Sequence, residues 1–250
     1  MRPRIAIPEP VSNRAEYNQR ALPQYVEAIE QAGGEARVIQ LAAGAADAAL
    51  QADECHAVLL PGSPADVDPG RYGEAGDPHT APPDPRRDEV DSALLRHAYE
   101  QGKPVLGICY GLQSLNVWRA GTLVQHIESS VNHEAGRAVL RAHRIRVTPE
   151  SRLAAILAGS AAAERLVAHV NSSHHQSASR VGEGLVAVAV CPEDGIVEAV
   201  EGTAPGHFVL AVQWHPERTT ATEEDSRAIF RAFVEAAGSR GNADSSLRSQ

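Results

Sequence analysis

The sequence has few cysteines and no long apolar run. These two features argue against a disulfide-rich protein and against a membrane protein. Only three of the 250 residues are cysteine, and the spacing of Cys55, Cys109 and Cys191 suits neither a disulfide framework nor a clustered metal site. No apolar run approaches the length of a membrane span, and the first residues lack the apolar core of a secretory signal. We therefore expect a protein of the reducing cytoplasm with no membrane partner.

Clustered positive charge is also missing. The chain has 23 Lys and Arg against 32 Asp and Glu, a net charge of -9, and no basic run. Nucleic acids and anionic membrane surfaces both require a basic footprint, so we expect neither as a partner. The hydrophobic fraction of 43% and the charged fraction of 22% are ordinary for a globular protein with a sizeable core.

Short apolar runs alternate with amphipathic stretches in the first half of the chain. Alternation at this spacing indicates βαβ units and a mainly parallel sheet with helices on both faces. Ligands of such sheets bind at the carboxyl ends of the strands. We expect strands at 5–7, 36–41, 57–60 and 105–108, and helices at 17–32, 45–52, 87–101 and 110–119.

The second half predicts further strands, partly antiparallel, and one last helix. The segment 61–85 is long and rich in Pro, Gly and Asp, which is typical of a functional or mobile loop. We expect one domain over residues 1–237 and a disordered polar tail over 238–250. The strands are expected at 185–190, 196–201 and 208–213, and the helix at 223–237, whereas 123–181 mixes polar residues with short runs such as 140–147 and 166–170.

Cys109 lies between Gly107 and Gly111, directly after an expected strand. A glycine-flanked nucleophile marks a sharp strand-to-helix turn that lifts its side chain out of the sheet. The helix start supplies free N–H groups and a positive dipole end, which lower a thiol pKa. A buried structural cysteine is the common alternative, and it is our interpretation of Cys55 and Cys191.

A second motif, residues 213–217, follows a later expected strand. His215 should reach the edge of the sheet, where Glu217 can bind one ring nitrogen while the other faces a thiol. The alternative is a loop histidine beside a solvated carboxylate. Because both motifs follow predicted strands, we favour a catalytic triad of Cys109, His215 and Glu217.

The two motifs together resemble class I glutamine amidotransferases. Other segments are similar to the gamma-glutamyl-gamma-aminobutyrate hydrolase family, in matching order from about residue 5 to residue 237. The resemblance implies a flavodoxin-like three-layer sandwich, the same triad, and hydrolysis of a gamma-glutamyl amide bond. Tyr110 and Arg218 depart from common patterns beside the motifs and leave substrate choice open. The segments that carry the likeness are 28–34, 60–64, 69–74, 87–88, 107–113, 170–176, 194–199 and 213–217.

An oxyanion hole follows from the expected geometry together with the resemblance. Gly62 and Ser63 end a strand that neighbours the Cys109 strand in such sheets, so backbone N–H groups there and at Tyr110 could converge on a carbonyl oxygen. A plain Pro-Gly turn is the alternative. Gln113, one helical turn past Cys109, is either a substrate contact or a polar residue of the helix start.

The resemblance places residues 171–176 near the substrate, which suggests substrate contacts from Ser172, Ser173 and His174. The pair His174-His175 also suggests a metal site as an alternative. We discount it and expect no metal or cofactor, because adjacent histidines cannot easily share one ion and no i, i+4 pair or Cys ligand accompanies them. Arg87 is either a solvated residue of a helix start or a partner for a substrate carboxylate.

The hypothesis is a cysteine-dependent hydrolase. It would cleave small gamma-glutamyl compounds, such as gamma-glutamyl-gamma-aminobutyrate, through a thioester and release glutamate. The main alternative is a glutaminase subunit that supplies ammonia to a separate synthetase. An α/β-hydrolase is disfavoured because its acid precedes the histidine by many residues, and a non-catalytic thiol sensor is disfavoured by the intact His215–Glu217 pair. The amine portion of the substrate is not determined, and a homodimer is the default oligomer.

Overall fold

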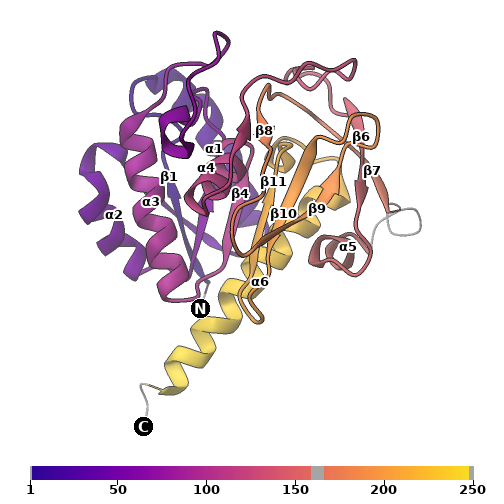
Figure 1. Cartoon of the computed structure of the whole chain (residues 1–250). Coiled ribbons are helices and arrows are strands. Elements are labelled where there is room, and N and C mark those ends of the chain that lie inside the picture. The colour runs from indigo at the N-terminus through magenta and orange to yellow at the C-terminus, as the bar shows by residue number, and fades with distance from the viewer. Residues whose placement is uncertain (1, 159–165, 248–250) are drawn as a thin grey trace.

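A mixed β-sheet runs through the molecule, with helices packed on both faces (Figure 1). The computed structural model describes residues 2–158 and 166–247. Within these residues the main sheet has nine strands, in the order β2-β1-β3-β4-β11-β10-β9-β6-β7. The strands of the main sheet are β1 (Arg4–Pro8), β2 (Glu35–Ile39), β3 (Ala57–Leu60), β4 (Val105–Ile108), β6 (His143–Val147), β7 (Val167–Val170), β9 (Leu185–Val190), β10 (Val197–Gly202) and β11 (Val209–Val212).

The half of the sheet formed by β2, β1, β3, β4 and β11 is parallel. Every residue of β3, β4 and β11 is buried, which is the pattern of strands covered by helices on both sides. β11 pairs with β4 in the register Val212↔Ile108, so the two strands end side by side. This pairing places the residues after each strand at one edge of the sheet.

The other half of the sheet is antiparallel. β10 pairs with β11 and β9, and β6 pairs with β9 and β7. In β6 buried and exposed residues alternate, so only one of its faces meets the core. A separate two-stranded ribbon joins β5 (Leu123–Val124) to β8 (Ser177–Ala178).

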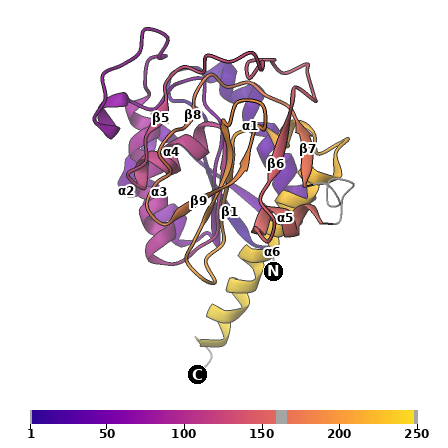
Figure 2. The same ribbon diagram turned by 45° about the vertical axis from the view of Figure 1, so that its right-hand side comes forward.

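Helices from distant parts of the chain share each face of the sheet. On one face α1 and α6 pack together, with Ile29, Phe230 and Phe233 in a core that α5 extends toward β6 and β7 (Figure 2). On the other face α2, α3 and α4 enclose a second core with Leu94, Leu112 and Leu115. The helices are α1 (Ala15–Gln31), α2 (Gly44–Asp53), α3 (Pro85–Glu100), α4 (Tyr110–Trp118), α5 (Arg152–Leu157) and α6 (Glu224–Leu247).

This architecture confirms the predicted α/β fold with a mainly parallel central sheet between two helical layers. The described helix α6 ends at Leu247, inside the stretch 238–250 for which a disordered tail is expected, and that expectation stays a prediction. Segment 61–85 contains the short 3-10 helix Pro69–Tyr72, and the Asp77 amide donates to the Gln125 side chain at 2.8 Å. No described helix is both long and apolar enough to span a bilayer.

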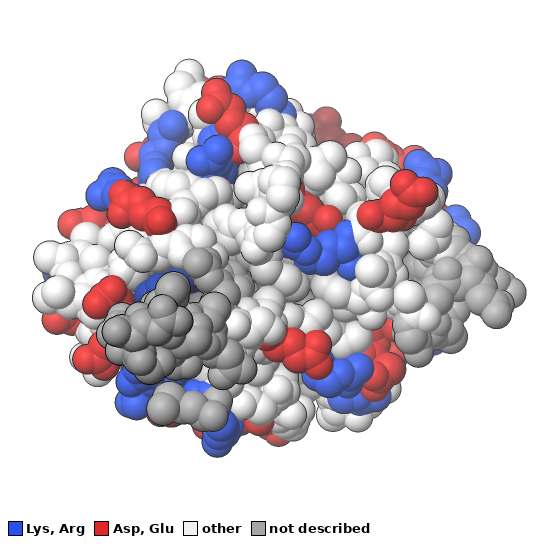
Figure 3. Space-filling view, turned by 90° about the horizontal axis from the view of Figure 1, so that it is seen from below, with Lys and Arg blue, Asp and Glu red and all other residues white. Residues whose placement is uncertain are grey.

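Surface charge is mixed rather than segregated on the face seen in Figure 3. Lys and Arg side chains there lie among Asp and Glu side chains and form no continuous basic surface. Mixed charge of this kind provides no electrostatic footprint for a polyanion on that side.

Candidate active site

Cys109 lies at a strained turn between β4 and α4. Its backbone has φ 54° and ψ -106°, in a region that residues with a Cβ rarely occupy. The flanking glycines permit the turn: a Cβ at Gly107 would lie 2.8 Å from the Gly111 carbonyl oxygen, and one at Gly111 would collide with Leu60. The glycine-flanked, strained turn predicted from the sequence is therefore present.

The His215 ring and the Cys109 side chain both lie beside Gly62. A Cβ at Gly62 would lie 3.0 Å from Cε1 of His215 and 3.6 Å from Cβ of Cys109. This arrangement follows from topology, because each side chain comes directly after one of the paired strands β4 and β11. Glycine at position 62 leaves the space in which the sulfur and the imidazole can face each other.

Hydrogen bonds fix both the ring and the backbone of His215. Its Nδ1–H donates to Glu217 Oε1 at 2.8 Å. The side chain of Asn171 accepts from the His215 amide at 2.9 Å and donates to the His215 carbonyl at 2.8 Å. Since Glu217 fixes the proton on Nδ1, Nε2 presents a lone pair, as a general base requires.

Burial sets the charge states of the three side chains. Burial lowers the pKa of His215, against the opposing charge of Glu217, so the ring is neutral at pH 7. Burial acts to raise the pKa of Glu217, but His215 and then Arg218 outweigh it and hold that pKa low. Burial also raises the pKa of Cys109 to about 12, although Arg218 and the Tyr110 amide oppose this. The expected lowering by the helix start is therefore outweighed, and the resting pair is a thiol beside a neutral imidazole.

The predicted oxyanion residues have different roles. The Gly62 amide donates to the Tyr25 hydroxyl at 3.0 Å, so this N–H is already engaged. The Tyr110 amide lowers the pKa of Cys109 by hydrogen bonding, which places it beside the thiol. The side chain of Ser63 accepts from the Ala65 amide at 3.1 Å. The backbone amides of Ser63 and Tyr110 are the better candidates for the oxyanion hole, and their role there stays a prediction.

Each predicted substrate residue has a partner within the protein. Gln113 donates to the Gln176 carbonyl at 3.1 Å and to Gln213 at 3.3 Å. The hydroxyl of Ser172 donates to the His133 carbonyl at 2.6 Å, and that of Ser173 accepts from Arg218 at 2.9 Å. His174 is buried against Glu198. Contact between these residues and a substrate stays a prediction.

Arg87 has a role that neither sequence interpretation anticipated. It is fully buried, and its Nε donates to Asp91 at 2.6 Å. Its other two nitrogens donate to the carbonyls of Pro10 at 2.8 Å and Pro61 at 2.7 Å, and its guanidinium lies 4.8 Å from the Tyr110 ring centre. Arg87 is thus not a solvated residue of a helix start: it contacts Pro61, which precedes Gly62, and Tyr110, which follows Cys109.

Tyr25 was also missed, because its spacing in α1 indicated an apolar core position. The side chain is buried, and its hydroxyl binds the Gly62 amide. A buried tyrosine requires a hydrogen-bond partner, and that requirement was the signal in the sequence.

Comparison with known proteins identifies the family. The family described as Peptidase C26 matches residues 5–217, which include both motifs. The chain belongs to the Peptidase C26 family. This family assignment agrees with the predicted likeness to glutamine amidotransferases and supports a hydrolase.

Individual relatives agree with this assignment. The Mycobacterium tuberculosis protein named "Putative glutamine amidotransferase Rv2859c" is 43% identical over 189 residues, which cover 74% of this chain and 56% of that protein. The chain therefore spans little more than half the length of that relative. The Escherichia coli K12 protein named "Gamma-glutamyl-gamma-aminobutyrate hydrolase PuuD" is 36% identical over 190 residues, covering 72% of this chain and 70% of that protein.

One solved structure shows the same fold. A Thermoplasma acidophilum protein described as a "putative gmp synthase subunit a protein" superposes with a TM-score of 0.67 and covers 98% of each chain. Its sequence identity is 13%. At this identity the likeness establishes that the two chains share a fold and carries no further statement about activity.

Proposed function

We propose that this Peptidase C26 protein hydrolyses the gamma-glutamyl amide bond of small gamma-glutamyl compounds. The observation that supports the proposal is that Cys109, on its strained turn, and the ring of the His215–Glu217 pair both lie beside Gly62 at adjacent strand ends. A nucleophile, a base and an orienting carboxylate are the parts that thiol acyl transfer requires. We assign the three roles to Cys109, His215 and Glu217 respectively.

The first half of the reaction forms a thioester. As substrate binds, Nε2 of His215 takes the thiol proton while Sγ of Cys109 attacks the gamma-carbonyl carbon. The resulting oxyanion accepts hydrogen bonds from the amides of Ser63 and Tyr110. His215 then gives its proton to the leaving nitrogen, the C–N bond breaks, and the free amine departs.

The second half regenerates the enzyme. His215 removes a proton from a water molecule, and the hydroxide attacks the thioester carbonyl. The C–S bond breaks, glutamate leaves, and the proton on His215 returns to Cys109. Glu217 keeps the proton on Nδ1 throughout and stabilises the imidazolium that forms twice in each cycle.

The gamma-glutamyl specificity rests on the relatives rather than on the site. The 36% identical Escherichia coli protein is named for hydrolysis of gamma-glutamyl-gamma-aminobutyrate. The alternative is a glutaminase that supplies ammonia to a separate synthetase, and the name of the 43% identical Mycobacterium tuberculosis relative favours it. The two differ in what the isolated chain does, because a synthetase-bound glutaminase should be nearly inert alone and prefer free glutamine.

The deciding experiment is a screen of the isolated protein with gamma-glutamyl amides and with glutamine, measured as glutamate release. We expect turnover of one or more amides, loss of turnover in Cys109→Ala, and accumulation of a gamma-glutamyl adduct on Cys109 under rapid quench. Cys55→Ala is the matched control, since this cysteine is equally buried but lies before β3. Full activity in Cys109→Ala would end the proposal, and exclusive use of glutamine would favour the glutaminase.

A further inference from the structure

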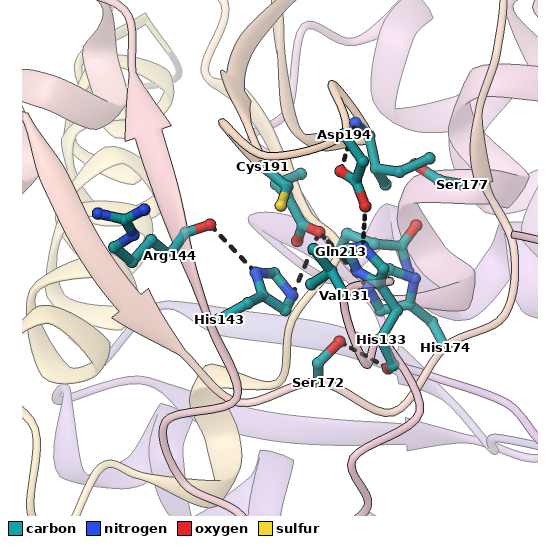
Figure 4. Close-up of polar contacts among 12 residues, drawn as sticks. Val131, His133, His143, Arg144, Ser172, His174, Ser177, Cys191, Asp194 and Gln213 are labelled. Atoms are coloured by element: carbon teal, nitrogen blue, oxygen red, sulfur yellow. Dashed lines mark hydrogen bonds and ion pairs between the residues drawn. The ribbon is translucent and has the colours of Figure 1, made fainter. Parts of the chain in front are cut away.

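Four buried side chains from four separate segments converge on one point. Figure 4 labels three of them, His133, His143 and His174. His133 lies in the connection between β5 and β6, His143 begins β6, His174 lies in the loop before β8, and Glu198 lies in β10. None is more than 7% exposed. One ligand atom of each residue lies within 4.8 Å of those of the others.

The cluster is centred on the Glu198 carboxylate. Its Oε1 lies 3.4 Å from Nδ1 of His133, 3.5 Å from Nε2 of His143 and 3.6 Å from Nε2 of His174. In the described part of the chain, these three nitrogens and both Glu198 oxygens have no hydrogen-bond partner. Buried polar atoms are nearly always paired, so five unpaired atoms at one point require an explanation.

In each of the three rings one nitrogen, the inner one, faces Glu198, and the other, the outer one, points away from it. The hydrogen bond of the outer nitrogen determines whether the inner nitrogen carries a proton or a lone pair. A neutral imidazole has one N–H and one lone pair, so a ring that donates outward presents its lone pair inward. Lone pairs of three imidazoles and a carboxylate facing one another repel unless a positive charge lies among them. Each outer nitrogen meets an oxygen that can only accept: His133 meets Asp194 Oδ2 at 2.9 Å, His143 the Arg144 carbonyl at 3.1 Å, and His174 the Gln176 carbonyl at 3.0 Å.

We propose that His133, His143, His174 and Glu198 bind one Zn²⁺ ion. Tetrahedral zinc with bonds of about 2.0–2.1 Å requires ligand atoms about 3.3 Å apart, close to the distances from Glu198 Oε1. Three imidazoles and one carboxylate are ligands that zinc accepts, and their outward hydrogen bonds are those of ordered metal-bound histidines. Four buried protein ligands leave no open position, so the ion would be structural.

The sequence argument against a metal does not hold in three dimensions. His174 and His175 do not share a ligand position, because Nε2 of His175 binds Asp66 at 3.0 Å. His174 instead joins residues that are distant along the chain, with no short spacing to reveal them. The other three candidate ligands, His133, His143 and Glu198, have no metal-type spacing to His174, which is why spacing rules did not indicate the cluster.

The experiment measures metal directly and does not depend on catalysis. Protein purified without metal-affinity resin is stripped with a chelator, incubated with Zn²⁺ or Co²⁺, desalted, and analysed by elemental mass spectrometry and visible absorption. We expect about one tightly held ion per chain and the intense visible bands of tetrahedral Co²⁺. Wild-type protein that retains neither ion, or that gives the weak spectrum of octahedral Co²⁺, would overturn the proposal.

Variants separate this site from adventitious surface binding. Glu198→Gln and His143→Gln should each lose at least tenfold in Zn²⁺ affinity. His169→Gln is the matched control, because this exposed histidine lies on β7, which pairs with β6 beside His143. His175→Gln is a second control, next to His174 in sequence but bound to Asp66. Equal metal content in all four variants would refute the assignment, and the wild-type Co²⁺ spectrum decides the case if a variant fails to fold.

Discussion

Replacing Arg87 tests whether a buried cation supports the thiol site. Arg87 and Asp91 are both fully buried, one turn apart on α3, and their side chains are joined at 2.6 Å. Arg87→Met keeps much of the side-chain volume but removes the charge and three hydrogen bonds. The carboxylate of Asp91 and the carbonyls of Pro10 and Pro61 then lose their donor.

The expected loss of stability is large. Removing one partner of a buried ion pair costs about 3–5 kcal/mol, because the other charge stays buried without compensation. The two unpaired carbonyls move the estimate toward the upper end. At an m-value of about 3 kcal/mol/M, a loss of about 4 kcal/mol lowers the urea midpoint by about 1.3 M.

The pH dependence has a defined sign. Burial raises the pKa of Asp91 even beside Arg87, and removing the cation raises it further. A group whose folded pKa is raised stabilises the protein at low pH, and this contribution is lost as pH rises through the folded pKa. The loss in free energy of unfolding caused by Arg87→Met should therefore be smaller at pH 5 than at pH 8.

The assay is urea unfolding followed by circular dichroism, with two comparison variants. Arg86→Met changes the neighbouring exposed arginine and should leave the midpoint nearly unchanged. The double variant Arg87→Met/Asp91→Leu removes both charges and should recover most of the loss. A cost below about 1 kcal/mol for Arg87→Met, or no recovery in the double variant, would show that the pair does not hold this region together.

Three further predictions concern the thiol site and the cluster. Gly62→Ala places a methyl group 3.0 Å from Cε1 of His215, so kcat/KM should fall about 10- to 100-fold with little change in urea midpoint; unchanged turnover would contradict the shared space. Because burial lowers the pKa of His215, the acid limb of the pH profile of kcat/KM should lie below pH 6.5. Glu217→Gln should move this acid limb to lower pH and lower kcat about 10³- to 10⁴-fold. An acid limb above pH 6.5 would argue against His215 as the base. Chelation should lower the melting temperature by about 5–10 °C if Zn²⁺ at about 100 Kd contributes about 2.7 kcal/mol, and an unchanged melting temperature would mean that the ion adds nothing to stability.

The central parallel strands β3, β4 and β11 were predictable because they are short apolar runs. The predicted bounds of β3 and β4 coincide with those observed. Burial on both faces removes polar residues from such strands, so the run itself marks the ends. β5 and β8 went unpredicted, since two-residue strands carry no periodicity.

The thiol site was predictable to the extent that its residues lie at strand ends. Cys109 and His215 follow β4 and β11, and pairing of these strands brings them together. Tyr25 and Arg87 could not be placed in this way. Both lie on helices, and their partners are backbone groups that leave no residue-type pattern in the sequence.

The loop 171–176 connects the two sites on which the proposals rest. Asn171 holds the backbone of His215, Ser173 accepts from Arg218, and His174 is a member of the cluster around Glu198. The backbone of a loop can move unless contacts fix it. Catalysis requires reacting groups to be placed to within well under 1 Å, so such movement would lower the rate. An ion bound by His174 would fix this loop to β6 and β10, while the hydrogen bonds of Asn171 would carry that position to the backbone of His215. The two sites would then be linked mechanically, with the cluster positioning His215 while taking no part in the reaction itself.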